Sequence, residues 1–276
     1  MCIRDRIRAF YQRSGGKSDP IDNTQYSIVR PGGNFGKHNN LAQHNYNDKY
    51  QFVENFSIFL GNHSIKLGAE YIFSPSGVDV FDNFIPGQYV FNTDKPFNAS
   101  DPTTYPYSFS YCKGDPPFDL PYHFFAPFVQ DSWRIHPRVT LNLGLRWNYY
   151  DCAGLKEDNF NIKQLNPRFG FSWDPTGDGK TSIRGGIGTF TANMNSNPAF
   201  PVIFFQDVTM TVLYYPGYPD PFKPNPFVAG MAIPTVFDEY VETKAVAPWT
   251  LQTTLGVQRE ILTDFSVSAD LVYSRG

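Results

Sequence analysis

The sequence predicts an all-β fold, an antiparallel meander of about 8–10 strands that forms part of a transmembrane barrel. Three observations predict it. Strand-like runs alternate apolar and polar residues, which places the two kinds on opposite faces of a strand. Short turns and long loops join these runs in strict alternation. Aromatic residues make up 17% of the chain and recur near the ends of the runs, as they do at the two membrane interfaces of a barrel.

The clearest strand is Val139–Tyr150, VTLNLGLRWNYY. Its odd positions are all apolar and end in aromatic rings, whereas its even positions are mostly polar and include Asn142 and Arg146. A half-buried strand of a soluble sheet and a barrel strand both produce this pattern, so this strand alone leaves the two open. In a barrel, lipid would meet Leu141, Leu143, Leu145 and Trp147.

The first predicted hairpin pairs Tyr50–Leu60 with His63–Phe73. Both runs alternate apolar and polar residues, and Gly61-Asn62 between them is a natural hairpin turn. Ser74–Pro121 follows. This stretch is rich in Pro, Asp, Asn and aromatic residues, and it is predicted to be a long irregular loop.

The second hairpin pairs Tyr122–Arg134 with Val139–Tyr150 across the short turn Ile135–Arg138. Pro127 lies inside its first strand. Because proline has no backbone N–H to donate, it predicts a bulge or a sheet edge at that point. Asp151–Leu165 is predicted to be another loop.

Two further hairpins complete the series, with a long loop, Thr191–Ala247, between them. The connector Pro175–Lys180 imitates the end of a phosphate-binding loop. The position of the leading glycine holds Asp174, however, and a strand follows instead of a helix, so a turn is predicted. The strands are Asn166–Asp174, Thr181–Phe190, Pro248–Glu260 and Phe265–Ser274.

The alternation of short and long connections favours a membrane barrel over a soluble all-β domain. Outer-membrane barrels have tight turns on the periplasmic side and long loops on the outer side. A soluble sandwich has no need for loops beyond about 15 residues. The soluble domain nevertheless stays open as an alternative.

Composition and motif spacing argue against several other classes of function. The net charge of −3 and the pI near 5.9 argue against a nucleic-acid groove. The five histidines lack metal-ligand spacing, so neither a metal nor a cofactor is predicted. No nucleophile motif occurs, and the chain is predicted not to be an enzyme. A glycosidase that draws an acid and a base from the loop carboxylates is the third reading.

The three cysteines show no metal-binding spacing either. Cys112 and Cys152 leave two readings open. They form a disulfide if they lie on the same face of the sheet, and otherwise they are free loop thiols.

The start of the chain is poorly defined. Met1–Arg6, MCIRDR, is charged and resembles translated sequencing-adapter sequence, so we expect an assembly scar there. Residues 1–45 are predicted to hold a loop and one or two strands, at Ile7–Gln12 and Thr24–Arg30, and residues 46–276 the partial barrel. Because the chain also stops on a strand-like run with no closing element, we expect a fragment.

Three stretches resemble a known family. Phe128–Arg146, FVQDSWRIHPRVTLNLGLR, resembles the barrel hairpin of TonB-dependent outer-membrane receptors, in which an aromatic–x–Gln–Asp–x–Trp strand turns into a Leu-Thr-Leu-Asn-x-Gly-x-Arg strand. Asn166–Phe190 and Trp249–Gly276, which contains QREI and ends in VYSRG, are similar to the Oar-like branch of that family. The three blocks occur in the family's order. The plug domain and the TonB box of the family are absent from this sequence.

The resemblance implies a barrel-wall and outer-vestibule segment of a receptor that takes up a solute across the outer membrane of a Gram-negative-type bacterium. The implied partners are outer-membrane lipid, the missing plug domain of the same protein and the TonB complex, with no nucleic acid. The solute class stays open among chelated iron, an oligosaccharide and a peptide. The alternatives are a porin without a plug and a secreted all-β glycan-binding or adhesion domain.

Two groups of residues are candidates for the site. Aromatic residues crowd the long loops, where they either contact the solute or pack the loops together. The candidate ligand-binding residues are Tyr105, Tyr107, Tyr111, Tyr214, Tyr215 and Tyr218. The polar strand faces would line the lumen, where their charges either steer a solute or form ion pairs that hold the wall. The candidate lumen residues are Asn142, Arg146, Arg168 and Arg184.

Overall fold

The computed structural model describes residues 2–22, 24–82, 84–113, 118–119, 121–152, 160–192, 209–236 and 246–276. These residues form one 11-stranded sheet and one six-stranded sheet, with a single short 3-10 helix, η1 (Pro102–Thr104). No helix in this part of the chain is long and apolar enough to span a membrane. The predicted all-β fold is confirmed.

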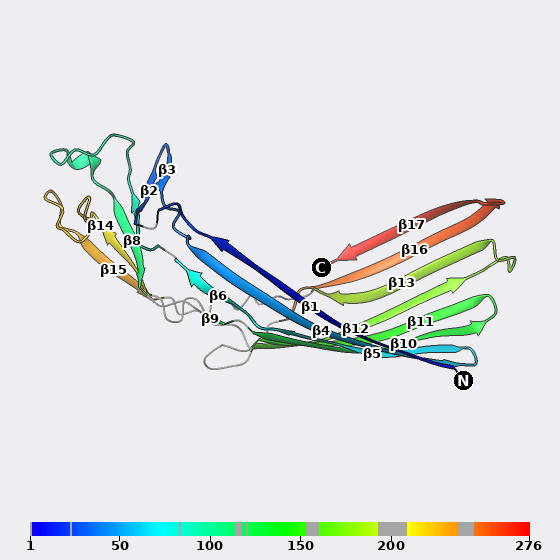
Figure 1. Ribbon diagram of the computed structural model, residues 1–276. Helices are drawn as coiled ribbons and strands as arrows, with labels where there is room; N and C mark the ends of the chain where they lie inside the picture. Colours follow the sequence, from blue (N-terminus) through cyan, green and yellow to red (C-terminus); the bar gives the residue numbers. More distant parts are fainter. Residues whose placement is uncertain are drawn as a thin grey trace.

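The large sheet is an antiparallel meander. Along its main path the strand order is β17-β16-β13-β12-β11-β10-β5-β4-β6-β9, and β1 pairs with the other side of β4 (Figure 1). The sheet does not close, because β17 pairs only with β16 and β1 only with β4 within the described residues. Its strands are β1 (Cys2–Ser18), β4 (Gln43–Leu60), β5 (His63–Ser74), β6 (Ser76–Phe81), β9 (Phe118–Asp119), β10 (Tyr122–His136), β11 (Val139–Cys152), β12 (Phe160–Trp173), β13 (Thr181–Thr191), β16 (Trp249–Leu262) and β17 (Phe265–Arg275).

All four predicted hairpins form in the large sheet. Nine of the described strands have 11 to 18 residues, which agrees with the predicted number. Gly61 begins the predicted turn with a φ of 57°, a left-handed conformation that glycine adopts without strain. The predicted loop Asp151–Leu165 was too long, because β11 continues to Cys152 and β12 already begins at Phe160.

The expectation of a bulge or an edge at Pro127 is wrong. Strand β10 lies between β5 and β11, and its register with β11 is the same on both sides of the proline. Pro127 pairs with Ala69 of β5, whereas Ala126 and Pro127 have no partner in β11. The sheet therefore accommodates the missing N–H as a gap in one ladder, without shifting the strand.

The register extends the alternation of β11 across the whole sheet. Leu145 pairs with Val129 and Pro167, and Val129 pairs in turn with Leu67. We call such a row of register partners across neighbouring strands a rung. This rung carries apolar side chains over four strands. We call this surface the apolar face and the opposite surface the polar face. No described layer covers the apolar face, and Leu67, Val129 and Leu145 each keep 40–42% of their surface exposed.

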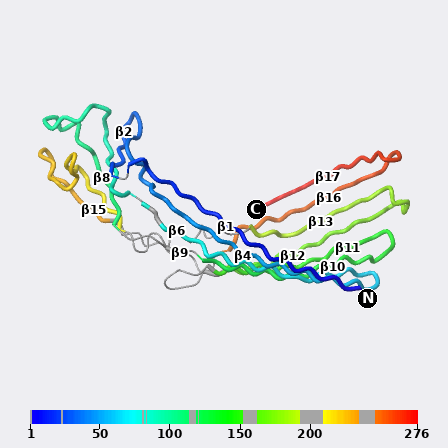
Figure 2. Tube along the Cα trace, in the orientation of Figure 1, coloured from blue at the N-terminus to red at the C-terminus, as the bar shows by residue number. Residues whose placement is uncertain are grey.

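Four strands of the small sheet, β7, β8, β14 and β15, come from segments predicted to be loops, so that expectation is corrected, whereas β2 lies within the predicted strand Thr24–Arg30. It has the order β15-β14-β8-β7-β2-β3 and contains one parallel pair, β2 with β7. Figures 1 and 2 show it at the end of the large sheet opposite the short hairpin turns. Its strands are β2 (Ser27–Arg30), β3 (Gly33–Gly36), β7 (Gln88–Val90), β8 (Ser108–Lys113), β14 (Thr209–Tyr214) and β15 (Met231–Val236).

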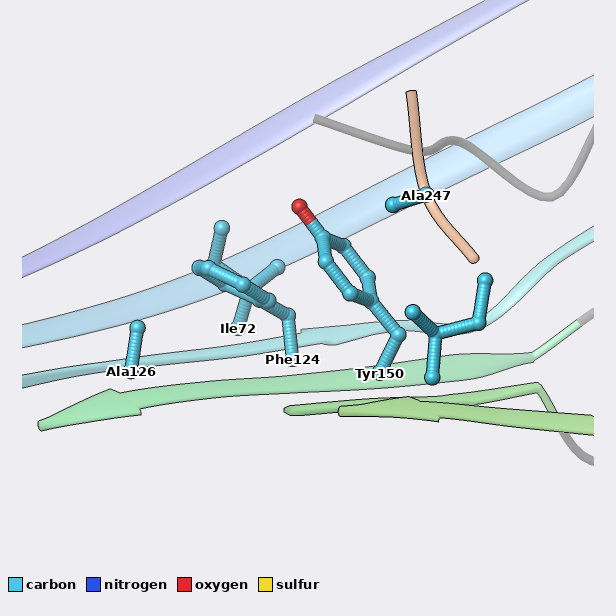
Figure 3. Packing of buried hydrophobic residues seen from close by; sticks show 6 residues of the cluster. Ile72, Phe124, Ala126, Tyr150 and Ala247 are labelled. Carbon is cyan, nitrogen blue, oxygen red and sulfur yellow. The ribbon is translucent and has the colours of Figure 1, made fainter. Parts of the chain in front are cut away.

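Each sheet has its own buried cluster. On the polar face of the large sheet, near the small sheet, side chains from β5, β10, β11 and β12 pack with Ala247, which precedes β16 (Figure 3). In the small sheet Tyr89, Phe91 and Phe109 are almost fully buried. The large-sheet cluster consists of Ile72, Phe124, Ala126, Tyr150, Ile162 and Ala247.

Candidate functional site

The six candidate tyrosines all belong to the small sheet or its connections. Tyr107 meets Tyr214 and Tyr215 edge to face, with ring centroids 5.5 and 5.8 Å apart. Tyr105 and Tyr218 both contact Phe97, with centroids 5.0 and 4.8 Å apart. The structure therefore gathers the predicted residues, and most of their contacts are with one another or with neighbouring aromatic rings.

Part of this aromatic surface is open to solvent. Tyr107 and Tyr215 keep 40% and 42% of their surface exposed, and Phe222 keeps 68%. Tyr215 has a φ of 52°, a left-handed conformation that costs a non-glycine residue energy. Tyr111 packs edge to face on Phe222, with centroids 5.5 Å apart.

Tyr89 was not among the candidates selected from the sequence, although its ring contacts those of Tyr26, Phe109 and Tyr218 in this cluster. It is fully buried on β7, its hydroxyl donates to the Pro219 carbonyl at 3.0 Å, and its ring meets that of Tyr218 at 5.1 Å. Burial raises the pKa of the Tyr89 phenol above its ordinary value, so the hydroxyl is a neutral donor. An apolar run of only a few residues gave no signal that this strand would be central.

On the polar face Arg146 is held in a network of partly buried side chains. One of its guanidinium nitrogens, Nη2, lies 2.6 Å from Oε2 of Glu70 on β5, and Nε donates to Asn148 at 3.0 Å. The other Glu70 oxygen accepts from Gln51 at 2.7 Å. The Arg146–Glu70 pair spans the intervening strand β10 where that strand carries the small, fully buried Ala126 opposite Glu70.

Arg184 forms a second ion pair of the same design. Its Nη2 lies 2.9 and 3.0 Å from the two carboxylate oxygens of Asp270 on β17. The pair spans β16 at Gly256, the register partner of both residues. A Cβ at Gly256 would collide with the Asp270 carboxylate, so the pair requires glycine there.

Arg168 differs from these two arginines because it has no ion-pair partner among the described residues. Its guanidinium lies over the Phe190 ring, 4.3 Å from the centroid. It borders a hollow of about 270 Å³ whose floor includes Gly144 and Gly170. The same hollow is lined on the polar face by Phe128, Gln130, Asn142, Arg146 and Arg168.

The predicted lipid-contacting residues of β11 lie on the apolar face. Leu143, Leu145 and Trp147 keep 42%, 41% and 36% of their surface exposed. Toward the small sheet this face carries stacked rings: Trp147 meets Tyr149 at 5.7 Å, and Phe73 meets His123 at 4.8 Å.

The segment that imitates a phosphate-binding loop is a turn, as predicted. The Asp174 carboxylate accepts from the backbone N–H groups of Gly177 at 2.8 Å and Gly179 at 3.0 Å. These bonds, with those from Thr176, lower the pKa of Asp174 below its ordinary value. Both carboxylate oxygens of Asp174 thus accept hydrogen bonds from within the turn.

The Cys112 thiol is free and half-buried on β8, and burial raises its pKa to about 11. The reading in which Cys112 pairs with Cys152 is therefore wrong, although the side chain of Cys152 itself lies outside the described set. Across the described ranges no group of three or more His, Cys, Asp or Glu side chains is placed to hold a metal ion.

Comparison with known proteins agrees with this geometry. A family model described as "Outer membrane beta barrel domain" matches residues 11–162 and 152–276. No curated protein matches significantly. Among solved structures, the outer membrane transporter YddB from Escherichia coli is similar, with a TM-score of 0.51 and 13% identity over 93% of this chain and 36% of that chain.

Two other solved structures have lower scores. The siderophore receptor PiuA from Acinetobacter baumannii has a TM-score of 0.45 and 13% identity over 84% of this chain and 32% of that chain. The CymD monoaromatic hydrocarbon channel has a TM-score of 0.30 and 9% identity, over 99% of this chain and 73% of that chain. The chain thus spans about a third of the length of the first two structures.

Proposed function

Because the chain belongs to the family of outer-membrane β-barrel domains, we propose that it forms the barrel wall and part of the outer vestibule of a TonB-dependent, Oar-like receptor that takes up a solute. Family membership confirms the predicted outer-membrane location. The observation that carries the proposal is the apolar face, which no described layer covers. The same strands carry a polar face on their other side, and the small aromatic sheet lies at one end of them.

In this function the apolar face meets lipid and the polar face meets the lumen. Hydrocarbon is the environment in which exposed leucine and phenylalanine side chains cost no free energy. The proposed lipid-facing residues are Leu141, Leu143, Leu145 and Trp147, and the proposed lumen-facing residues are Asn142, Arg146, Arg168 and Arg184.

The small sheet supplies the solute-contacting surface of the vestibule. Its exposed rings offer large, rigid contact areas that suit a sugar, a peptide or an aromatic chelator of iron. The proposed contact residues remain Tyr105, Tyr107, Tyr111, Tyr214, Tyr215 and Tyr218. The plug domain of the same protein and the TonB complex would complete the transport cycle, and no covalent chemistry takes part.

Uptake by the whole protein in its host tests the proposal. The expected result is accumulation of a solute that stops when TonB is deleted or the proton gradient is collapsed. The purified protein should show no steady conductance in a planar bilayer. Passive conductance without TonB would establish a porin instead, and recovery of the protein away from the outer membrane, without heat-modifiable gel mobility, would contradict the barrel itself.

A further inference from the structure

The polar face of the large sheet carries cations that the sheet does not neutralise. Arg146 and Arg184 are paired with Glu70 and Asp270. Lys66 on β5 and Arg168 on β12 have no ion-pair partner among the residues that the structure describes, and both are exposed. The arginines of β11 and β13 are therefore neutralised by carboxylates of the same sheet, whereas the cations of β5 and β12 are not.

These two cations belong to a single rung. Lys66 pairs with Gln130, Gln130 with Gly144, and Gly144 with Arg168. Between Lys66 and Arg168 this rung carries only the side chain of Gln130, because Gly144 has no side chain. Three members of the rung, Gln130, Gly144 and Arg168, line the hollow of about 270 Å³ described above.

Several side chains that line the hollow have hydrogen-bonding groups that the described residues leave unused. The Gln130 and Asn142 amides line it and form no side-chain hydrogen bond with the described residues. The Lys66 ammonium lies 5.9 Å from the centroid of Phe128, which also lines the hollow. The Arg168 side chain and two amides line this hollow, and the Lys66 ammonium lies beside Phe128 on its wall. Together they offer the guanidinium fork and the point charge that carboxylate and phosphate groups require.

We propose that Arg168, Lys66 and the Gln130 and Asn142 amides form a binding site for an oxyanion, a carboxylate or phosphate group, on the lumen side of the wall. Rings of Lys and Arg side chains select anions in pores by the same physics. The oxyanion belongs either to a solute or to an acidic side chain in another part of the same protein. The site rests on the barrel assignment and does not depend on TonB or on transport.

Arg4, Arg6 and Arg8 line a neighbouring hollow of about 160 Å³ together with Lys66. They would strengthen the positive potential of this wall. Because Arg4 and Arg6 fall in the segment predicted to be foreign, the site is assigned without them.

Two measurements on the whole purified protein test the site and distinguish the two sources. In the first, inorganic phosphate is titrated and its binding is followed by ³¹P NMR line width. A site for solutes predicts saturable binding that weakens at least tenfold in the double variant Arg168→Gln, Lys66→Gln. Arg138→Gln, which removes an exposed arginine from the β10–β11 turn, is the matched control and should bind as the wild type does.

In the second measurement, a carbodiimide couples amines directly to touching carboxylates, and mass spectrometry maps the bonds. If an acidic side chain of the same protein fills the site, the carbodiimide should couple Lys66 to an aspartate or glutamate. In the variant Arg168→Lys the introduced amine should be coupled in the same way. The proposal is overturned if the wild type shows neither phosphate binding nor such a bond, or if the wild type binds phosphate and the double variant binds it equally well. The wild-type results suffice if the variants do not fold.

Discussion

At the scale of single residues, neighbours in sequence on β11 have opposite environments. Leu143 lies on the apolar face, where no described layer covers it, and Asn142 lines a polar hollow. Comparing the same substitution at the two positions therefore tests which face meets hydrocarbon.

Leu143→Arg is expected to destabilise the protein folded in lipid vesicles, lowering its free energy of unfolding by about 2–4 kcal/mol, because it places a charge near the bilayer midplane. Asn142→Arg adds the same charge to the polar face and should cost far less. Reversible folding of the whole protein into vesicles, titrated with denaturant, measures both. Equal losses would contradict the assigned faces.

The two ion pairs on the polar face differ in burial. The Arg146 and Glu70 side chains are 24% and 22% exposed, whereas Arg184 and Asp270 are 49% and 46% exposed. Water screens the second pair much more strongly than the first.

Arg146→Gln is therefore expected to cost about 2–3 kcal/mol, because it leaves the Glu70 carboxylate half-buried without its cation. Arg184→Gln should cost less than about 1 kcal/mol. Denaturant unfolding of the two variants gives the comparison, and a larger loss for Arg184→Gln would show that the exposed pair is the more important one.

At the scale of elements, the connector between β12 and β13 is organised by one carboxylate. Asp174 accepts hydrogen bonds from the N–H groups of Gly177 and Gly179, both of which have a φ of 72°. Its lowered pKa means that the ionised form binds the turn more tightly than the neutral form.

The contribution of Asp174 to stability is therefore present above the ordinary carboxyl pKa and is lost as the pH falls through the lowered folded value. The Gly177 amide resonance of the whole protein should titrate with a midpoint below 3.8, the ordinary value for aspartate. In Asp174→Asn that titration should disappear. A midpoint at or above 3.8 would show that the carboxylate does not hold the turn.

The hairpins could be predicted from sequence because each is local. Alternation identifies the two strands, a turn of Gly and Asn or of Pro and Arg separates them, and register follows from the faces. Pro127 misled the prediction because the sequence does not show which neighbouring strand loses the hydrogen bond.

The small sheet could not be predicted in the same way. Its strands are short, interrupted by Pro and Gly, and paired with distant segments: Ser108 pairs with both Val90 and Tyr214. Such pairing leaves no periodic signal in the sequence, although the aromatic composition did indicate that these segments are not ordinary linkers. Residues 193–208 and 237–245 of the predicted loop Thr191–Ala247 lie outside the described part of the chain. The ion-pair partners of the arginines were also hidden, because Glu70 and Arg146 meet only through the order of the strands.

At the scale of the whole molecule, the large sheet has two surfaces that require different environments. The apolar face presents Leu145, Phe169, Ile187 and Leu271 at 41–70% exposure. The polar face carries two ion pairs and a rung whose two cations have no ion-pair partner among the described residues. Water on both sides would leave the apolar face exposed at a large free-energy cost. A bilayer on one side and a lumen on the other satisfies both.

The most direct test is a cysteine scan of Val139–Trp147 in the whole protein, with each cysteine labelled by an environment-sensitive fluorophore in lipid vesicles. We expect strict alternation: labels at odd positions are quenched by lipids that carry a quencher on their acyl chains, and labels at even positions by a water-soluble quencher. Quenching by the aqueous agent at every position, or quenching by neither at the odd positions, would contradict it.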